Sequence, residues 1–210
     1  NSLKADDLQK VFLAGNPMDY SGDYATRLET SSEIRTVADS FIGPGLQIIQ
    51  GVALLPDEFQ GGYFQDSNLV HLAMPGVIDL KYPGTSGFEL SESEYEPGRV
   101  VLRPQAIRSQ ALSAGLVFMS STRLIEKPLT DFSSQPGLVS DFLRAGAESV
   151  VVDFWSVNTE SNNAFITDFY SRLKRTGDVS VSLRDARLNS LRTQSDSNLY
   201  DWAGYQVFIK

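Results

Sequence analysis

Short apolar runs alternate with longer amphipathic stretches along the chain, and turns rich in glycine and proline separate them. Short apolar runs between turn signals are typical of buried strands, whereas apolar residues spaced three and four apart are typical of helices that pack on a sheet. A regular alternation of the two patterns predicts an α/β domain whose sheet is mostly parallel. The sequence contains no internal repeat and no low-complexity tract.

The first elements illustrate how the boundaries are placed. Residues 11–14 are apolar and end at a Gly-Asn-Pro turn, which predicts a strand. The hydroxyl residues 30–32 offer N-cap oxygens for a helix that begins near Glu33 and stops at the Gly-Pro-Gly turn at 43–45. The same rules predict strands at 46–49, 69–74, 116–120, 149–155 and 205–209, helices at 55–63, 105–112, 138–147, 162–173 and 181–191, and a hairpin between 88 and 102.

Composition excludes several classes of function. The 210-residue chain has a formal net charge of −8, no cysteine and one histidine, His71. It therefore has no disulfide, no thiolate ligand and no sulfur nucleophile, and one imidazole excludes a histidine-rich zinc site. The acidic balance argues against nucleic acid as a partner, and no stretch of ~20 apolar residues predicts membrane insertion. We expect a single domain, residues 1–210, without cofactor or metal, that is a C-terminal fragment of a larger protein.

The residues that could carry chemistry have simpler interpretations. His71 stands inside the apolar run LVHLAM, so we expect a buried imidazole that is held by a backbone carbonyl. Ser120, Ser121 and Thr122 follow a predicted strand, where α/β enzymes often carry a nucleophile, but no GxSxG motif surrounds them. The acidic tip of the hairpin lacks the ligand spacing of a calcium loop, so we expect a solvated loop there.

Ordered blocks of the sequence resemble the CHAT domain, a caspase-like α/β family that is related to caspases and separases and is named for its association with TPR repeats. The blocks are LVHLAMPG, PGTSGFEL, LVFMSST, VSDFLRAGAESVVVDFWSVN, FYSRL, SLRDARL and YDWAGYQVFI, and VFLAGNP and LETSSEIRTVA extend them toward the N-terminus. The resemblance implies a caspase-like three-layer sandwich of about six mostly parallel strands with helices on both faces, and a site at the carboxyl ends of the strands.

The resemblance also indicates which residues are missing. Active members of the family carry a catalytic histidine in an H-x-A-x-H-G block and a catalytic cysteine in an L-S-A-C block, and the matching positions here are Pro75 and Thr122. Proline has no side-chain base, and threonine needs an adjacent base to attack a carbonyl. His71 does not replace the missing base, because four residues of extended strand place it ~13 Å from position 75.

We therefore interpret the chain as a catalytically inactive, caspase-like domain that recognises, regulates or scaffolds a protein or peptide partner. The pseudo-active cleft that the family implies is formed by Met74, Pro75, Gly76, Ser121, Thr122 and Arg123. The alternative is a hydrolase whose oxygen nucleophile is Thr122, Ser120 or Ser121. Asp153 or Lys127 would then act as its base. A third interpretation is a structural domain without a ligand. The resemblance also implies a bacterial, cytoplasmic parent protein that carries TPR repeats.

Overall fold

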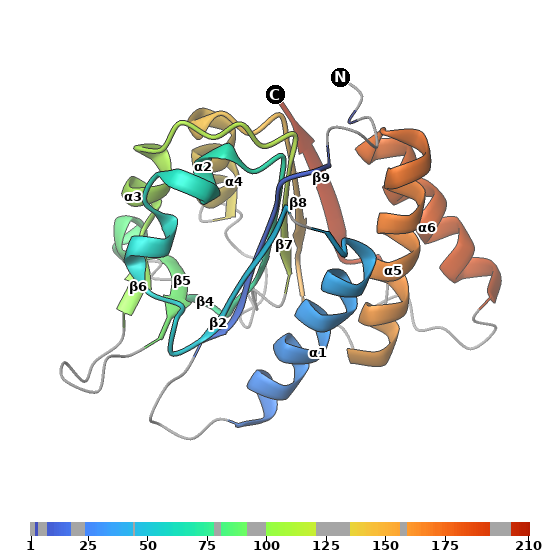
Figure 1. Ribbon diagram of the computed structural model, residues 1–210, viewed down its shortest axis with the longest axis horizontal. Coiled ribbons are helices and arrows are strands. Elements are labelled where there is room, and N and C mark those ends of the chain that lie inside the picture. Colours follow the sequence, from blue (N-terminus) through green and yellow to red (C-terminus); the bar gives the residue numbers. More distant parts are fainter. Residues whose placement is uncertain are drawn as a thin grey trace.

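The computed structural model describes residues 3, 8–17, 24–43, 45–77, 81–91, 100–120, 135–155, 159–193 and 203–210. These residues form three layers, which Figure 1 shows with the central sheet nearly edge-on. The helices α2, α3 and α4 cover one face of the sheet, and α1, α5 and α6 cover the other. The α/β sandwich that the sequence predicts is therefore confirmed.

The central sheet has six strands in the order β2-β1-β3-β7-β8-β9. Its strands are β1 (Val11–Pro17), β2 (Leu46–Gly51), β3 (Leu69–Ala73), β7 (Leu116–Ser120), β8 (Ser149–Asp153) and β9 (Tyr205–Ile209). Only β9 runs antiparallel, against β8. Every residue of β3, β7 and β8 is buried, because helices cover both faces, and this explains why these strands read as continuous apolar runs.

The helices differ in length from the sequence prediction more than the strands do. They are α1 (Tyr24–Ser40), α2 (Gly62–Asp66), α3 (Pro104–Arg108), α4 (Gln135–Ala145), α5 (Thr159–Thr176) and α6 (Val179–Thr193). A small antiparallel sheet of β4 (Gly76–Val77), β5 (Gly87–Leu90) and β6 (Val100–Leu102) lies beside the central one. It contains the predicted hairpin, whose acidic tip at 92–99 lies outside the described residues.

Two helix predictions are wrong for identifiable reasons. The helix α1 begins at Tyr24, so the hydroxyls at 30–32 lie inside the helix and do not cap it. The helix predicted at 55–63 is instead a 3-10 turn at Pro56–Phe59 followed by α2. Gly61 and Gly62 separate the two with φ angles of 72° and 53°, which a continuous right-handed helix does not accommodate.

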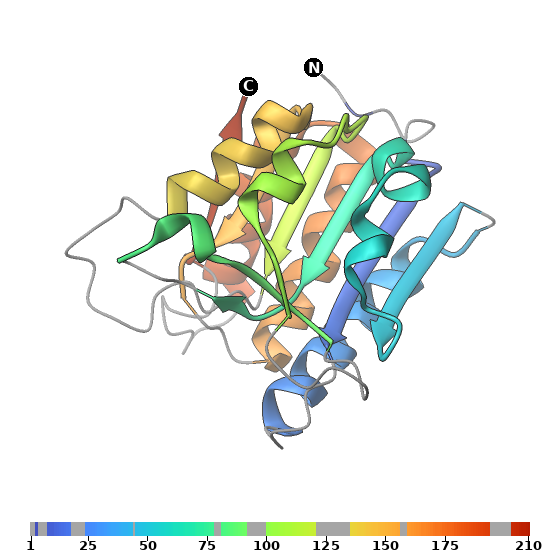
Figure 2. The ribbon, with the colours of Figure 1, turned by 90° about the vertical axis from the view of Figure 1, so that its left-hand side faces the viewer.

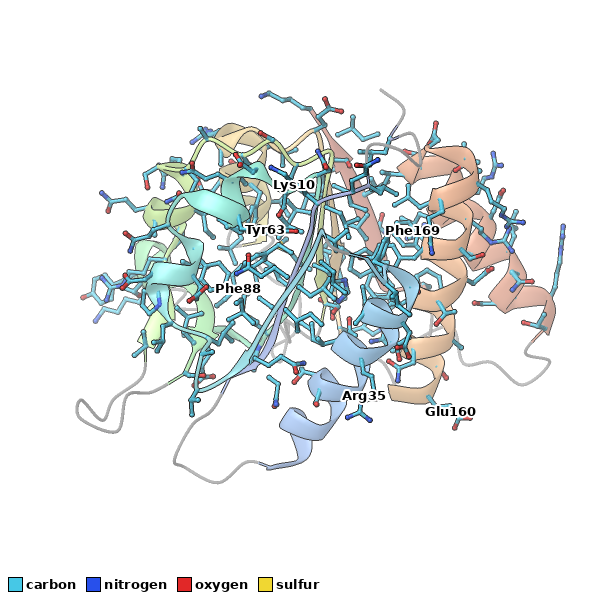
Figure 3. The ribbon with its side chains drawn as sticks, viewed as in Figure 1. Lys10, Arg35, Tyr63, Phe88, Glu160 and Phe169 are labelled. Carbon is cyan, nitrogen blue, oxygen red and sulfur yellow. The ribbon has the colours of Figure 1, made fainter. Side chains whose placement is uncertain are left out.

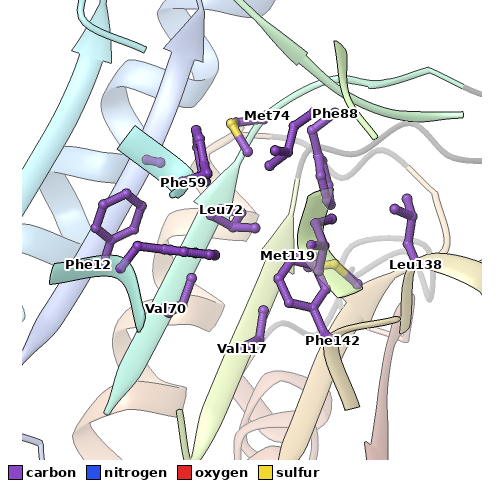
Figure 4. Packing of buried hydrophobic residues seen from close by; sticks show 14 of the residues in the cluster. Phe12, Phe59, Val70, Leu72, Met74, Phe88, Val117, Met119, Leu138 and Phe142 are labelled. Carbon is purple, nitrogen blue, oxygen red and sulfur yellow. The ribbon is translucent and has the colours of Figure 1, made fainter. Parts of the chain in front are cut away.

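The core is divided by the sheet into two packed clusters. One cluster lies toward α2, α3 and α4, and Figure 4 shows Phe12, Val70, Leu72 and Phe142 within it. The other lies toward α1, α5 and α6, where Phe169 points from α5 to the sheet (Figure 3). Successive residues of a strand point to opposite faces, so each buried strand contributes to both clusters.

Gly15 lets α1 approach the sheet closely. A Cβ atom at this position would lie 2.7 Å from the Ala73 carbonyl oxygen and 2.8 Å from Cγ1 of Ile34 on α1. Both distances are shorter than atoms tolerate without a shift of the neighbour. The glycine at the end of β1 therefore brings α1, and the residues that it carries, directly over β1 and β3.

Candidate functional site

The parallel strands of the central sheet end at one common edge, as the arrowheads in Figure 2 show. In open α/β sheets this edge is where ligands bind. The adjacent strands β3 and β7 end there in register, with Ala73 opposite Ser120. The segments that follow these two strands are the ones in which the sequence resemblance implies the positions of a catalytic histidine and cysteine.

The segment after β3 is bonded into the small sheet. Met74 has no exposed surface and packs in the apolar cluster beside Phe88, which Figure 4 shows. Pro75 is half-buried, and its carbonyl oxygen accepts a hydrogen bond of 2.8 Å from the Glu89 backbone N–H. Gly76 begins β4 and pairs with Phe88. Pro75 and Gly76 thus lie partly exposed at the edge of the sheet, and Met74 supports them from the core.

The segment after β7 begins at the limit of the described residues. Ser121, Thr122, Arg123 and Lys127, which the sequence analysis places in or near the cleft, lie outside them. Ser120, the last residue of β7, has no exposed surface. Asp153, the base proposed for an oxygen nucleophile, is buried at the end of β8 and pairs across the sheet with Tyr205.

His71 is buried in β3, as its apolar surroundings predict, but the expected backbone partner is wrong. Its ring has no exposed surface, and both nitrogens contact side chains. Nε2 lies 3.0 Å from Oε1 of Glu33, and Nδ1 lies 2.8 Å from the Tyr170 hydroxyl. One face of the imidazole stacks on Phe118, with ring centroids 5.2 Å apart and planes 18° apart. No part of the ring is available to a substrate.

Glu33 is the centre of a buried polar network. Its Oε1 accepts hydrogen bonds from Ser120 Oγ and faces His71, and its Oε2 accepts one of 3.0 Å from Nδ2 of Asn162. The Asn162 Oδ1 in turn accepts a hydrogen bond from the Tyr205 hydroxyl. We call these residues, with Tyr170, the Glu33 network. It connects α1, β3, β7, α5 and β9 on one face of the sheet.

The buried network raises the pKa values of its two tyrosine hydroxyls, Tyr170 and Tyr205. Burial raises the pKa of Tyr170 well above its usual 10.0, and the nearby Glu33 carboxylate raises it further. Burial also raises the pKa of Tyr205, and Glu33, Asp153 and Tyr170 add to that effect, whereas the hydrogen bond with Asn162 lowers it. Both hydroxyls therefore keep their protons at neutral pH, and the Tyr205 hydroxyl donates to Asn162 Oδ1.

The sequence analysis did not identify Glu33 as a site residue, although a signal was present. Thr30, Glu33, Ile34 and Val37 are all buried, and their spacing of three and four places them on one face of α1. An acidic residue within the apolar face of a helix needs a polar partner in the core. The signal was lost because the helix was predicted to begin at Glu33, where an acidic residue is ordinary.

Among the described residues, no cluster of three or more histidine, aspartate or glutamate side chains could hold a metal ion. Within the same residues, no helix is long and apolar enough to cross a membrane.

The sheet topology and the helical layers first define the fold class of the protein. An open, mostly parallel six-stranded sheet between two helical layers, with its candidate site at the carboxyl edge, is a caspase-like α/β domain. The family model described as the CHAT domain matches residues 6–209, so the chain belongs to the CHAT domain family. The resemblance that the sequence blocks suggest is thereby confirmed.

Solved structures support the fold at low sequence identity. The chain is similar to a chain of the Saccharomyces cerevisiae separase-securin complex at 2.6 Å, with a TM-score of 0.54 and 15% identity over 96% of this chain. A second structure of that complex, at 3.0 Å, gives a TM-score of 0.50 and 15% identity over 98% of this chain. This chain spans only 12% of the length of either match. No curated protein matches the sequence.

Proposed function

We propose that this CHAT domain is catalytically inactive and acts as a protein-recognition, regulatory or scaffolding module. The observation that carries the proposal is the burial of its only imidazole, with both ring nitrogens engaged by Glu33 and Tyr170. Peptide hydrolysis by this family's chemistry needs a thiolate and an imidazole that exchanges a proton with the substrate. The chain has no cysteine, and it has Pro75 where the family carries the second histidine.

The alternative, a hydrolase with an oxygen nucleophile, needs a base beside a hydroxyl. Ser120 and Glu33 have this arrangement, because Ser120 Oγ donates to the Glu33 carboxylate. However, Ser120 is 0% and Glu33 1% exposed, so no substrate carbonyl reaches the hydroxyl. The carboxylate also accepts a hydrogen bond from Nδ2 of Asn162, which fixes it within the network. The geometry therefore favours a structural role for this pair.

The proposed partner is a protein or peptide, bound at the pseudo-active cleft around Pro75 and Gly76, with Ser121, Thr122 and Arg123 from the segment after β7. Half-buried backbone at the edge of a rigid sheet suits the binding of an extended peptide. The similar yeast chains were solved in a complex with another protein, which supports a protein partner here. We further propose a bacterial, cytoplasmic parent protein in which TPR repeats accompany this domain.

Hydrolysis of a diverse library of fluorogenic peptides and esters tests the absence of activity. The purified domain is compared with Thr122→Ala, Ser120→Ala and His71→Ala, each checked for folding by circular dichroism. We expect all four proteins to match the buffer blank. Turnover by the wild type that disappears in Thr122→Ala would show that the domain is an oxygen-nucleophile hydrolase.

Peptide display tests the recognition role. We expect the folded domain to select a family of related peptides, and Thr122→Arg to weaken their binding by about tenfold or more, which corresponds to at least ~1.4 kcal/mol. Leu191→Lys is the matched control, because Leu191 is 55% exposed and lies on α6, which contributes no residue to the proposed cleft. Equal binding by all three proteins would place recognition outside the cleft.

A further inference from the structure

The strand β2 forms one lateral edge of the central sheet. It pairs with β1 on one side, and within the described residues no strand pairs with its other side. Figure 2 shows β2, in cyan, at the margin of the sheet with no described element beyond it. This edge is distinct from the carboxyl edge where the pseudo-active cleft is proposed, because it runs along the length of a strand.

The register of β1 and β2 determines which backbone groups point outward. The Val11 N–H bonds to the Gly45 carbonyl, and Val11 is paired with Leu46. In a parallel ladder the bonds slant between alternate residues, so Gln47 and Ile49 direct their N–H and C=O groups to β1. Leu46, Ile48 and Gln50 direct theirs away from it.

Two of the backbone groups of β2 that point outward already form hydrogen bonds at the ends of the strand. The Leu46 N–H bonds to the Gly43 carbonyl, and the Gln50 carbonyl accepts the Ala53 N–H. Between described residues, no hydrogen bond uses the Leu46 carbonyl, the Ile48 N–H and carbonyl, or the Gln50 N–H, so these groups can pair with another strand. These groups form a continuous ladder centred on Ile48, which is long enough for four main-chain hydrogen bonds.

The side chains around this ladder lack the usual protection of a sheet edge. Natural edge strands carry charges, prolines or bulges that prevent further pairing. The 17 residues from 40 to 56 contain no charged side chain, in a chain that is 21% charged. The large apolar residues Ile42, Ile48, Val52 and Leu55 in this stretch are 84%, 43%, 63% and 40% exposed.

An unpaired acceptor lies on the same strand. The Oε1 atom of Gln47 is buried and has no hydrogen-bond partner. Buried acceptors are rarely left unsatisfied in native structures, since each costs about 1–3 kcal/mol. This strand therefore carries unsatisfied hydrogen-bonding capacity in one of its side chains.

We propose that the outer edge of β2 binds an extended, uncharged segment of a partner protein, which adds a seventh strand to the sheet. Main-chain bonds to Leu46, Ile48 and Gln50 give affinity, and apolar side chains of the partner cover Ile48 and Val52. A second copy of this chain is the less suitable occupant, because two domains of net charge −8 repel one another. The acidic residues Asp39 and Asp57, exposed on either side of the neutral stretch, favour lysine or arginine around the bound segment.

Hydrogen exchange of the whole domain with a strand-forming peptide tests this edge. The probe is the peptide KKTVTVTVTKK, and its N-methylated version, which cannot form the ladder, is the ligand control. We expect the peptide to slow exchange of the Ile48 and Gln50 amides. The Gln47 and Ile49 amides are an internal control, because β1 already protects them.

Two substitutions separate edge pairing from other binding. Ile48→Lys places a charge at the centre of the ladder and keeps its backbone, and we expect it to weaken peptide binding by about tenfold or more. Leu191→Lys, the same change at an exposed site on α6, should alter the affinity less than about twofold. Ile48→Lys is retained for analysis only if its thermal unfolding matches that of the wild type, and otherwise Ile48→Thr replaces it.

The outcomes are distinct. Selective protection of Ile48 and Gln50 that Ile48→Lys removes supports the proposal. Absence of protection at about 1 mM peptide, or equal binding by Ile48→Lys, overturns it. A dimer in light scattering that dissociates in Ile48→Lys, without peptide binding, assigns the edge to a second copy instead. None of these results depends on the pseudo-active cleft, so this proposal and the proposed function can fail separately.

Discussion

The two faces of the central sheet bury similar strands in different ways. Toward α2, α3 and α4, the central strands β3 and β7 present apolar side chains to their cluster, such as Val70, Leu72 and Val117. Toward α1, α5 and α6, the same strands add His71 and Ser120 to an otherwise apolar surface, and Glu33, Asn162 and both buried phenols complete the network. At β3 and β7 the first face is held by apolar packing, whereas the second also depends on the directional bonds of the Glu33 network.

This difference indicates how the stability of the protein responds to substitutions on each face. Apolar packing is non-directional. The free energy of unfolding that is lost when a cavity forms therefore depends on the volume of the cavity, and distant residues are unaffected. A buried network is coupled, because removing one member leaves the others without partners in a medium of low dielectric constant. We therefore expect the face with the Glu33 network to be less tolerant of substitution and more dependent on pH.

Removal of the central carboxylate should have the largest effect. Glu33→Ala leaves the Ser120 hydroxyl, the Asn162 amide and one His71 nitrogen without their partner, and we expect the free energy of unfolding to fall by about 3–5 kcal/mol. Urea unfolding followed by circular dichroism measures it. Asp39→Ala, an exposed acidic site on the same helix, is the control and should cost less than about 0.5 kcal/mol. A loss below about 1 kcal/mol for Glu33→Ala would show that the network contributes little.

Truncation on the apolar face should cost somewhat less. Leu72→Ala removes a fully buried side chain beside His71 in the sequence, and we expect a loss of about 3 kcal/mol. The measurement is the same, and Val52→Ala, at 63% exposure, serves as a control that should change little. If Leu72→Ala lowered the free energy of unfolding more than Glu33→Ala, the apolar face would be the one that is less tolerant of substitution, contrary to our expectation.

Double-mutant cycles test the coupling directly. Glu33→Gln is used because the milder change keeps double variants folded. Combined with Asn162→Ala, its direct partner, it should show a coupling energy of about 0.5–3 kcal/mol. Combined with Leu72→Ala, on the opposite face, the two losses should add within about 0.5 kcal/mol. Additivity in both cycles would contradict the contrast between a coupled face and an uncoupled one.

The smallest of the expected effects is the change at alkaline pH in how much Tyr205 contributes to stability. The pKa of Tyr205 is raised in the folded protein, so its contribution to stability is complete below pH 10.0, the ordinary value, and is lost as pH rises toward the folded pKa. Tyr205→Phe loses one hydrogen bond, about 1 kcal/mol, at neutral pH. We expect the stability gap between wild type and Tyr205→Phe to narrow above about pH 10. A gap that widens there would contradict the raised pKa.

Much of the fold could be predicted because its signals are local. The strands at 69–74, 116–120 and 149–155 were recognisable as apolar runs, and the structure places β3, β7 and β8 there. Helix ends were less predictable, since α1 extends upstream to Tyr24 from the hydroxyls that were interpreted as its cap. The break at Gly61 and Gly62 depends on two positive φ angles that composition does not report.

The candidate site was predictable only in part, because its bonds join distant positions. His71 could be expected to be buried from its neighbours, but its partners Glu33 and Tyr170 lie 38 and 99 residues away in the chain. No spacing rule connects an acid on one helix, a phenol on another and an imidazole on a strand between them.

The sequence by itself determined the chemistry that this protein lacks and the general order of its elements. A missing thiol is absent from every conformation, and Pro75 has no side-chain base wherever the chain places it. Only the tertiary structure decided that Ser120 faces a buried carboxylate, that His71 has no free nitrogen and that β2 lies at the edge of the sheet. The physical reason is that hydrophobic periodicity acts over neighbouring residues, whereas hydrogen-bond partners and strand neighbours are chosen when remote elements pack together.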